Sequence, residues 1–361
     1  MLINNITLSN FRNYSKAEAN FSENLNLVIG KNGQGKTNLI EAIYMLSLGR
    51  SFRTNKDKEM MMFDALNTYI SSEVTAMGRN YKIEIKLGKD IKKAVKINSI
   101  PIEKLTDLLG IINIVIFSPE DLKLVREGPK ERRGFMDREI SQLRPNYYSL
   151  IHKYQKILVQ RNNLLKNTKI DENLLDVYDE QLAIVSQKIM AYRKEFIDNI
   201  TPIASANHYR ISSGKEKLNI KYLPNITASS EIDFDSSYIF NKFKTSRAED
   251  MRRRTTTSGP HKDDIGIYLG DMDLRSFGSQ GQKRSAAISL KLSEIQLIFE
   301  EKNEYPVVLL DDIFSELDIS RQKMLIDSLS EIQTFVTTTE AIDFNKEVKT
   351  YLIENAKVSL L

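Results

Sequence analysis

The sequence predicts an α/β protein: a core of mixed sheets with flanking helices, interrupted by an inserted, mainly helical lobe. Three observations predict this fold class. Apolar runs rich in β-branched residues, typical of strands, occur towards both ends of the chain. A glycine-rich turn at 30–35 joins one such run to a helical pattern. Between about 120 and 199 glycine is scarce, and apolar residues recur at spacings of three and four.

The individual elements follow from these patterns. Strands are expected at 2–8, 25–29, 68–76, 81–87, 94–97, 265–269, 307–310 and 334–336, and helices at 37–48 and 285–299. Asn98 and Ser99 are expected to form a hairpin turn, and 201–237 a loop-rich interval. The core is therefore expected at 1–116 and 256–361, and the helical lobe at 117–255. No repeat or heptad array is present, which excludes a long coiled coil.

Composition excludes several classes of protein. The 361 residues suggest about two domains, and 41% hydrophobic with 28% charged residues fits a globular protein. Cysteine is absent, which excludes disulfides, thiolate catalysis and cysteine zinc sites, and the three histidines are too few for a histidine-rich metal site. No apolar run reaches membrane-spanning length and no leader peptide is recognisable, so we expect a cytoplasmic protein without a membrane partner.

Residues 30–37, Gly-Lys-Asn-Gly-Gln-Gly-Lys-Thr, match the P-loop pattern in full between a strand and a helix. The glycines let backbone N–H groups turn towards a phosphate at the positive end of the following helix. Lys36 is expected to reach the β- and γ-phosphates, and Thr37 to bind Mg²⁺. The residues expected to bind ATP are Gly30, Lys31, Asn32, Gly33, Gln34, Gly35, Lys36, Thr37 and Asn38.

An apolar strand at 307–310 ends in two acids, as a Walker B segment does. Asp311 is expected to hold Mg²⁺ together with Thr37, and Asp312 to orient the attacking water or accept its proton. Lys36 and Asp312 are thus the expected catalytic residues. Without a P-loop the same segment would equally fit a buried parallel strand ending in a capping aspartate.

A polar turn before the helix at 285–299 determines the class of ATPase. The signature turn, residues 279–282, consists of Ser279, Gln280, Gly281 and Gln282. It resembles the Ser-Gly-Gly-Gln signature sequence of ABC-type ATPases, with Gln280 at the position of the first glycine. It lies about thirty residues before the Walker B strand, and Asp318 follows Asp311 by seven residues as a D-loop aspartate. This order is that of ABC-type ATPases, in which we expect the signature turn to act on the nucleotide of a second copy. A capped helix is the alternative interpretation of the turn taken alone.

Several further blocks resemble the RecF family, the short relatives of the structural-maintenance-of-chromosomes ATPases. They are distributed between residues 10 and 339, and therefore over nearly the whole chain. The blocks are Asn-Phe-Arg-Asn-Tyr at 10–14, Ser-Phe-Arg-Thr at 51–54, Phe-Ser-Pro-Glu-Asp-Leu at 117–122, Glu-Arg-Arg at 131–133, Ser-Gly-Pro-His-Lys-Asp-Asp at 258–264 and Leu-Asp-Asp-Ile-Phe-Ser-Glu-Leu-Asp at 310–318.

The resemblance implies a function in recombinational gap repair. It implies binding of double-stranded DNA and single-strand/duplex junctions, an ATP-dependent homodimer, and a weak DNA-stimulated ATPase. It also implies RecR as a partner, acting with RecO to load RecA at gaps during repair and the SOS response. The usual switch histidine is missing, and the strand at 334–336 is followed by Thr337, Thr338 and Thr339. Asp312 stands in place of the usual glutamate, and a glutamine loop is placed only provisionally at 117–122. These departures favour slow hydrolysis.

Two basic runs are candidates for DNA contacts. Lys153 and Lys156 belong to an acid-free run at 153–169, and Arg252, Arg253 and Arg254 to a second run at 242–262. Such runs bind phosphates, although a solvated helix face would look the same. His261 is expected to be structural rather than catalytic. An ABC-type nucleotide-gated interaction protein without DNA binding is the alternative; a GTPase is disfavoured because no Asn-Lys-x-Asp motif is present.

Overall fold

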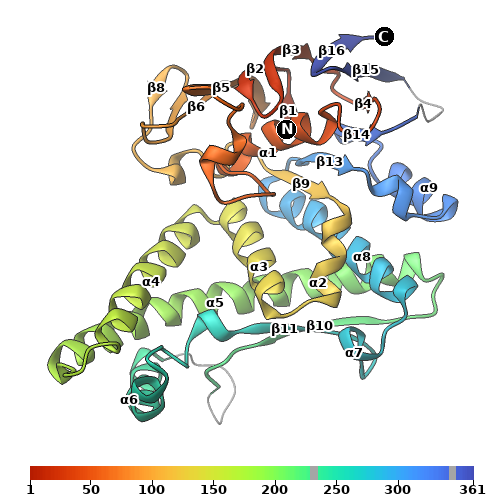
Figure 1. Ribbon diagram of the computed structural model, residues 1–361. Helices are drawn as coiled ribbons and strands as arrows, with labels where there is room; N and C mark the ends of the chain where they lie inside the picture. Colours follow the sequence, from red (N-terminus) through yellow and green to blue (C-terminus); the bar gives the residue numbers. More distant parts are fainter. Residues whose placement is uncertain (228–234, 341–346) are drawn as a thin grey trace. The chain divides into compact units, whose positions relative to one another are not determined.

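The computed structural model describes residues 1–227, 235–340 and 347–361. These residues form two compact units. The first unit comprises Met1–Asp121 and Lys291–Leu361, and it contains both termini; the second comprises Leu122–Leu290 (Figure 1). Helix α8 (Gln280–Lys302) contains the second boundary between them.

A mainly parallel sheet forms the centre of the first unit. Among the described residues it has six strands in the order β16-β15-β4-β14-β13-β9, of which only the edge strand β16 pairs antiparallel. The strands are β4 (Leu25–Ile29), β9 (Ile114–Phe117), β13 (Val307–Asp311), β14 (Thr334–Thr338), β15 (Val348–Glu354) and β16 (Lys357–Leu360). Every residue of β9 and β13 is buried, as expected for parallel strands covered on both faces.

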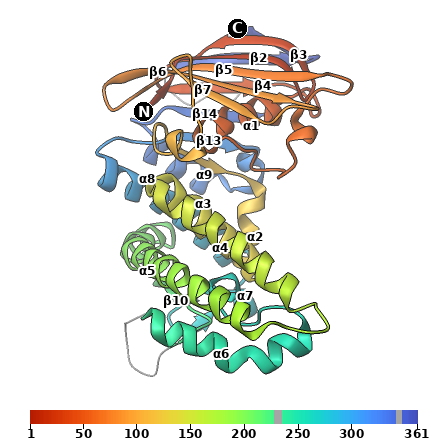
Figure 2. The same ribbon diagram turned by 90° about the vertical axis from the view of Figure 1, so that its left-hand side faces the viewer.

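An antiparallel sheet forms a second layer of the same unit (Figure 2). Its described strands are β1 (Leu2–Ile3), β2 (Asn5–Phe11), β3 (Tyr14–Asn20), β5 (Asn67–Ala76), β6 (Arg79–Gly88), β7 (Ala94–Ile97) and β8 (Ile100–Pro101). Asn98 and Ser99 connect β7 to β8 with φ values of 51° and 68°. Two consecutive positive φ values are typical of a type I′ hairpin turn, so the predicted turn is confirmed.

Helix α1 (Lys36–Leu48) packs between the two sheets of the first unit. It contacts β9, β13 and β14 of the parallel sheet and β2 of the antiparallel sheet. Eleven of its thirteen residues are buried, which is the pattern of a helix surrounded by protein. Gly49 ends the helix in the left-handed conformation with its N–H bonded to the Met45 carbonyl, as at many helix C-termini. The shorter α9 (Ile319–Ser328) follows β13.

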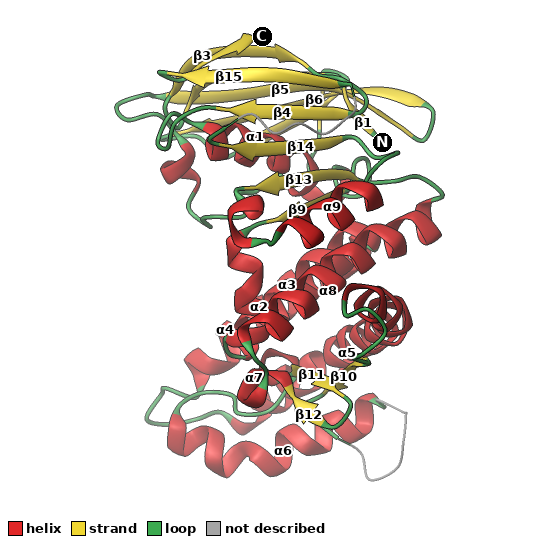
Figure 3. Ribbon diagram, turned by 90° about the vertical axis from the view of Figure 1, so that its right-hand side faces the viewer, coloured by secondary structure: helices red, strands yellow, loops and turns green. Residues whose placement is uncertain are grey.

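The second unit is mainly helical, as Figure 3 shows. Its described helices, besides the start of α8, are α2 (Leu122–Arg126), α3 (Pro129–Leu143), α4 (Pro145–Leu164), α5 (Glu172–Ile211), α6 (Ser236–Arg253) and α7 (Leu274–Phe277). A small antiparallel sheet joins β10 (Leu218–Leu223), β11 (Asp264–Leu269) and β12 (Met272–Asp273). No helix in the described part of the chain is both long and apolar enough to cross a membrane.

The predicted loop-rich interval at 201–237 is wrong over most of its described length. Helix α5 continues through Pro202 to Ile211, β10 follows, and α6 begins at Ser236. Proline removes one helical hydrogen bond, but buried residues on the following turns, including Ile203 and His208, keep the helix packed. Tertiary packing therefore outweighs the helix-breaking residue.

The segment 256–290, which the sequence assigned to the core, groups with the second unit. Strand β11 pairs along its whole length with β10. Asp264, its first residue, also accepts two hydrogen bonds from Arg132 of α3, at 2.6 and 2.8 Å. These long-range partners were not visible in the local pattern, so the second boundary lies inside α8 rather than at 256.

Candidate nucleotide-binding site

The P-loop connects β4 to α1, and two of its glycines, Gly30 and Gly35, have no room for a side chain. A Cβ on Gly30 would clash with the Ile353 carbonyl oxygen. At Gly35, which has φ of 122°, a Cβ would lie 2.9 Å from the Asn13 amide nitrogen and 3.0 Å from the Tyr14 hydroxyl. Gly35 is also the N-cap of α1, and no side chain caps this helix. The backbone therefore presents N–H groups at the positive end of a buried helix, which suits an anion.

Lys36 is directed back onto the loop that precedes it. Its ammonium group donates to the carbonyl oxygens of Gly30 at 2.7 Å and Lys31 at 3.2 Å. The residue is 4% exposed, so its charge is placed inside the loop rather than in solvent. That Lys36 binds the β- and γ-phosphates stays a prediction.

Thr37 and Asp311 lie next to each other, although 274 positions separate them in the chain. The Thr37 hydroxyl is 3.1 Å from the Asp311 carboxylate, to which Thr337 also donates at 2.9 Å. Burial raises the pKa of Asp311, and the hydrogen bonds from Thr337 and Thr37 oppose that shift. The two predicted magnesium ligands therefore form a pair of oxygen donors at the carboxyl end of β13.

Thr337 supports the Walker B segment from the neighbouring strand β14. Its hydroxyl donates to Asp311 and accepts from the backbone N–H of Asp312 at 2.9 Å. In the sequence Thr337 was one of three threonines after the strand at 334–336, and nothing singled it out. Asp312 itself adopts φ of 51°, the left-handed conformation that few non-glycine residues take. The backbone is held there directly after the strand, and the Asp312 side chain is half-buried.

Glu41 organises the residues around the P-loop, and it belongs to none of the motifs recognised in the sequence. Its carboxylate is fully buried on α1 and binds Arg12 through two hydrogen bonds of 2.8 and 2.6 Å. Ser51 donates to the same carboxylate, and Arg53 lies 3.4 Å from it. Glu41 is the only acid in the apolar stretch 37–48, which is the signal that could have identified it.

The two blocks nearest the P-loop in sequence thus have a structural explanation. Asn13 donates to the Gln34 carbonyl at 3.0 Å and accepts from Asn38 at 2.8 Å. The buried Tyr14 hydroxyl donates to the Gly35 carbonyl at 3.0 Å. Arg53 donates to Asn38 at 2.9 Å, and its charge acts to lower the Asp311 pKa. These side chains support the P-loop from outside, and Arg53 adds a partly exposed cation beside it.

The signature turn forms a reciprocal cap at the start of α8. The Ser279 N–H donates to the Gln282 side-chain oxygen at 2.8 Å, and the Gln282 N–H donates to the Ser279 hydroxyl at 3.2 Å. This is the capping-box geometry, so the alternative interpretation of a capped helix is correct as a description of local structure. Ser279, Gln280 and Gly281 are exposed. The turn can therefore be capped and still be accessible to a ligand.

The other two predicted loops are also described. Asp318 caps α9 by accepting from the Arg321 N–H at 3.0 Å, and it is exposed. The stretch 117–122, proposed as a glutamine loop, contains no glutamine; Asp121 accepts from the Ser118 N–H at 2.6 Å and closes a short turn. It ends at the boundary between the two units.

The blocks at 131–133 and 258–264 meet in the second unit and form a buried polar network. Asp263 accepts from Arg193 at 2.9 Å and from the Asn225 N–H at 2.8 Å, and burial raises its pKa. His261 is buried enough to lower its pKa to about 4, so it is neutral near pH 7. One ring nitrogen contacts the Thr256 carbonyl and the other the Tyr154 hydroxyl. These contacts support the expectation that His261 is structural.

The two basic runs differ in how their charges are engaged. Arg252 and Arg253 both bind Glu249. The hydrogen bond from Arg252, and after it the one from Arg253, lower the pKa of Glu249 to about 2. Arg254, which is exposed, ends α6 in the left-handed conformation. Lys153 and Lys156 are exposed on α4, which contains no acid. Arg161 of the same run is fully buried and pairs with Asp179 and Asp250, so it is not available for DNA.

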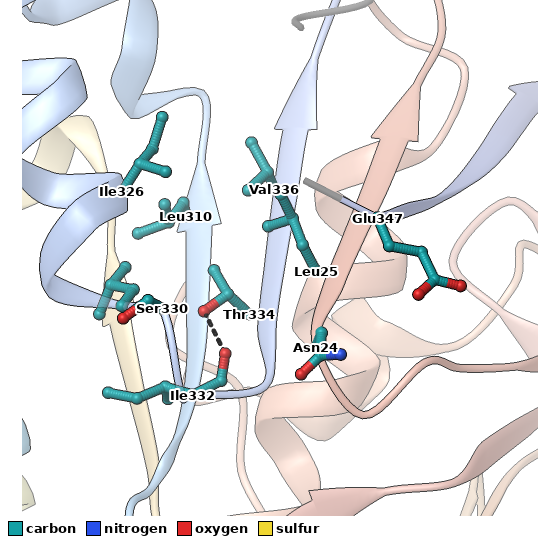
Figure 4. A pocket seen from close by; sticks show the side chains of 10 residues that line it. Asn24, Leu25, Leu310, Ile326, Ser330, Ile332, Thr334, Val336 and Glu347 are labelled. Carbon is teal, nitrogen blue, oxygen red and sulfur yellow. Dashed lines mark hydrogen bonds between the residues drawn. The ribbon is translucent and has the colours of Figure 1, made fainter. Parts of the chain in front are cut away.

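A cavity of about 260 Å³ lies elsewhere in the first unit (Figure 4). Its lining is mainly apolar and includes Leu25, Leu310, Ile326, Ile332 and Val336. Leu25 begins β4, whereas the P-loop follows the end of that strand. The cavity is therefore at the opposite end of β4 from the P-loop, and its apolar lining does not suit a phosphate. Within the described ranges, no cluster of three or more histidine, aspartate or glutamate side chains is arranged to hold a metal ion.

A parallel sheet, an uncapped P-loop helix and a Walker B pair, together with an inserted helical unit, define the class as a P-loop ATPase head. Comparison with known proteins agrees. The model of the RecF/RecN/SMC N terminal domain matches residues 2–359. The chain belongs to this family.

Individual relatives are RecF proteins. The chain is 49% identical to the DNA replication and repair protein RecF of Clostridioides difficile (strain 630), over 99% of this chain and 98% of the relative. It is 45% identical to RecF of Alkaliphilus oremlandii (strain OhILAs), over 94% and 93%. A solved structure of the recombination mediator protein RecF-ATPrS in the RecFOR pathway superposes with a TM-score of 0.94 at 36% identity, covering 100% and 98% of the two chains. An Smc head bound to the C-winged helix domain of ScpA, 14% identical with a TM-score of 0.57, shares the fold. The predicted fold class and the family resemblance are confirmed.

Proposed function

We propose that this protein acts in DNA replication and repair as an ATP-gated, DNA-binding recombination mediator. The observation that carries the proposal is the geometry at the start of α1, where an uncapped helix end, a buried Lys36 and the Thr37–Asp311 pair occur together. The similar RecF structures described with ATP and with ATPrS support ATP as the nucleotide.

The residues present fit Mg²⁺ beside the nucleotide. Magnesium in phosphate sites takes one or two carboxylates, hydroxyl oxygens, waters and phosphate oxygens. Thr37 and Asp311 supply a hydroxyl and a carboxylate 3.1 Å apart. Bound there, the ion would supply charge neutralisation at the phosphate oxygens. Lys36 would move its ammonium group from the loop carbonyls to the phosphates, while Asp312 orients the attacking water and accepts its proton.

The signature turn is proposed to act in trans, in a two-fold dimer with two identical sites. One copy would hold ATP with Lys36 and Asp311, while Ser279 of the second copy donates its hydroxyl to the γ-phosphate. The exposed turn supports this, since Ser279 already accepts a hydrogen bond and retains its own O–H for a phosphate oxygen. Asp318, exposed at the start of α9, would lie at the same dimer interface.

DNA is proposed to bind through its phosphates, because no set of side chains suited to reading base edges is evident. Lys153 and Lys156 are the better-supported contacts, since the guanidinium groups of Arg252 and Arg253 are already engaged by Glu249. The double-stranded and junction substrates, the weak DNA-stimulated ATPase, the cytoplasmic location and the action with RecR and RecO upstream of RecA are proposed from the family relationship.

Sedimentation of the protein alone, with ATP, with DNA, and with both tests the proposal. A dimer that requires ATP, and binds DNA more tightly as a dimer, is the expected result. ATP-dependent dimerisation without any DNA retention at low or high salt would favour the alternative, a nucleotide-gated interaction protein.

Salt dependence distinguishes the two basic runs. The slope of log K against log salt is negative. If Lys153 and Lys156 each contact a phosphate, replacing both by glutamate should reduce the magnitude of this slope by at least about 0.9 per contact. Replacement of Arg252, Arg253 and Arg254 by glutamate should reduce the magnitude of the slope less, because Glu249 already neutralises part of that charge. Equal slopes for the wild type and the α4 variant would show that α4 is only a solvated face.

A further inference from the structure

We infer that Glu216 is a positioning residue for the signature turn, an inference that rests on the proposed shared ATP site. Glu216 lies between α5 and β10. One oxygen of its carboxylate accepts a hydrogen bond from the side-chain nitrogen of Gln282 at 2.8 Å. The contact joins a segment outside the nucleotide-binding motifs to the last residue of the turn.

The chemistry of the Gln282 amide gives this contact its importance. A glutamine amide has an accepting oxygen at one end and a donating nitrogen at the other. In Gln282 the oxygen accepts from the Ser279 N–H at 2.8 Å, and the nitrogen donates to Glu216. A carboxylate only accepts and a backbone N–H only donates, so the amide satisfies both partners in one orientation. Glu216 therefore fixes the orientation that holds the Ser279 backbone.

A second contact ties Glu216 to the long helix α5. Its other carboxylate oxygen is 3.0 Å from His208, whose ring is fully buried. The second ring nitrogen of His208 is 3.1 Å from the Ser289 hydroxyl, ten positions after Ser279 and on α8. Glu216 thus connects to α8 directly through Gln282 and indirectly through His208. Two contacts therefore hold the start of α8 against α5, one at Gln282 and one at Ser289. They keep the exposed Ser279 hydroxyl in one place for a nucleotide of the second copy.

The test compares Glu216→Ala with Glu216→Gln in the full-length chain. The alanine variant should bind ATP within about twofold of the wild type but hydrolyse it about tenfold more slowly, a change of about 1.4 kcal/mol in the barrier. The glutamine variant should recover most of the rate, because its amide oxygen can still accept from Gln282. Glu195→Ala is the matched control: Glu195 is an exposed acid on α5 whose partner Arg144 lies 3.6 Å away.

Hydrogen exchange without nucleotide provides a readout independent of activity. Exchange of the backbone N–H groups of residues 279–283 should become faster in Glu216→Ala and remain normal in Glu195→Ala and Glu216→Gln. Unchanged exchange and unchanged kcat in Glu216→Ala would overturn the inference. A wild-type protein that neither hydrolyses ATP nor dimerises would overturn the proposed function instead, and the exchange result would still decide whether Glu216 positions the turn.

A further pair of variants covers the case in which Glu216→Ala does not fold. Gln282→Glu retains a capping oxygen for Ser279 but places a carboxylate opposite Glu216, so exchange at 279–283 should rise. Adding Glu216→Gln should reverse that rise, because the new amide donates to the carboxylate at position 282. No reversal in a folded double variant would also overturn the inference.

Discussion

Helices α1 and α8 both begin at a glycine-containing polar turn, yet their first turns are constructed differently. At α1 the N-cap is Gly35, and no side chain bonds to the helix N–H groups. At α8 the Ser279 hydroxyl and the Gln282 side chain occupy the first N–H groups reciprocally. An uncapped helix end suits strong anion binding, whereas at a capped end the chain itself already satisfies some of the N–H groups.

The difference suggests that the two helix ends act at different steps of the ATP cycle. The α1 end needs no rearrangement of a cap before a phosphate binds, and only the Lys36 ammonium group changes partner. The α8 end offers one exposed hydroxyl, whose proton is not required by the cap. We therefore expect the first end to determine ATP affinity in a single copy, and the second to determine dimer closure and hydrolysis.

Lys36→Met should have the largest effect. Removing the ammonium group leaves the phosphates without their lysine, and removal of one partner of a buried charged pair commonly costs about 2–5 kcal/mol of binding free energy. ATP affinity, measured by titration of a fluorescent analogue, should fall accordingly while the thermal melting curve stays close to wild type. Lys16→Met, at an exposed position of strand β3, is the control. Normal ATP affinity in Lys36→Met would refute the P-loop assignment.

Asp312→Asn should affect hydrolysis without changing the start of α1 or the start of α8. Asp311 still pairs with Thr37, so ATP binding should be normal, but the base that accepts the water proton is lost. We expect kcat to fall by about 100-fold and the ATP-bound dimer to accumulate in sedimentation. Wild-type turnover would assign the catalytic base to another residue.

Ser279→Arg tests whether the α8 end acts on the second copy. The arginine should spare ATP binding but block dimer closure and hydrolysis. Mixed with Lys36→Met chains, it should recover some activity, because one site of the mixed dimer pairs intact Lys36 with intact Ser279. The recovered ATPase should stay below about half of normal, since the other site carries both lesions. Hetero-association without any recovery would count against a shared site.

Ser279→Ala should give the smallest effect and shows what the cap alone contributes. Loss of a serine N-cap costs about 1 kcal/mol of stability. Hydrolysis should also fall, because the hydroxyl donor to the second copy is gone, whereas ATP affinity of the monomer should not change. A melting shift with full hydrolysis would show that Ser279 serves only the local structure of α8.

The local motifs of the P-loop, Walker B and signature segments were predictable because each depends on a few neighbouring residues. Strand β4 and the hairpin at Asn98 were likewise predicted from a run of adjacent side chains. The extension of α5 past Pro202 was not, because burial on the turns that follow outweighs the lost hydrogen bond. Helix α6 was expected only as part of the helical lobe and as one interpretation of a charged run. Its own bounds were not predicted, because the contacts of Asp250 with Arg161 and of Arg247 with Asp179 are made to other helices.

By itself the sequence determined the class of protein, because glycines, a lysine and two acids at fixed spacings already specify a phosphate-binding loop and its acidic partner. Only the tertiary structure showed that Thr337 supports Asp311, that Glu41 gathers Arg12 and Ser51, and that Glu216 holds Gln282. These contacts join side chains far apart in the chain or on different elements. Their partners become neighbours only when the strands and helices pack, so no local pattern of residues records them.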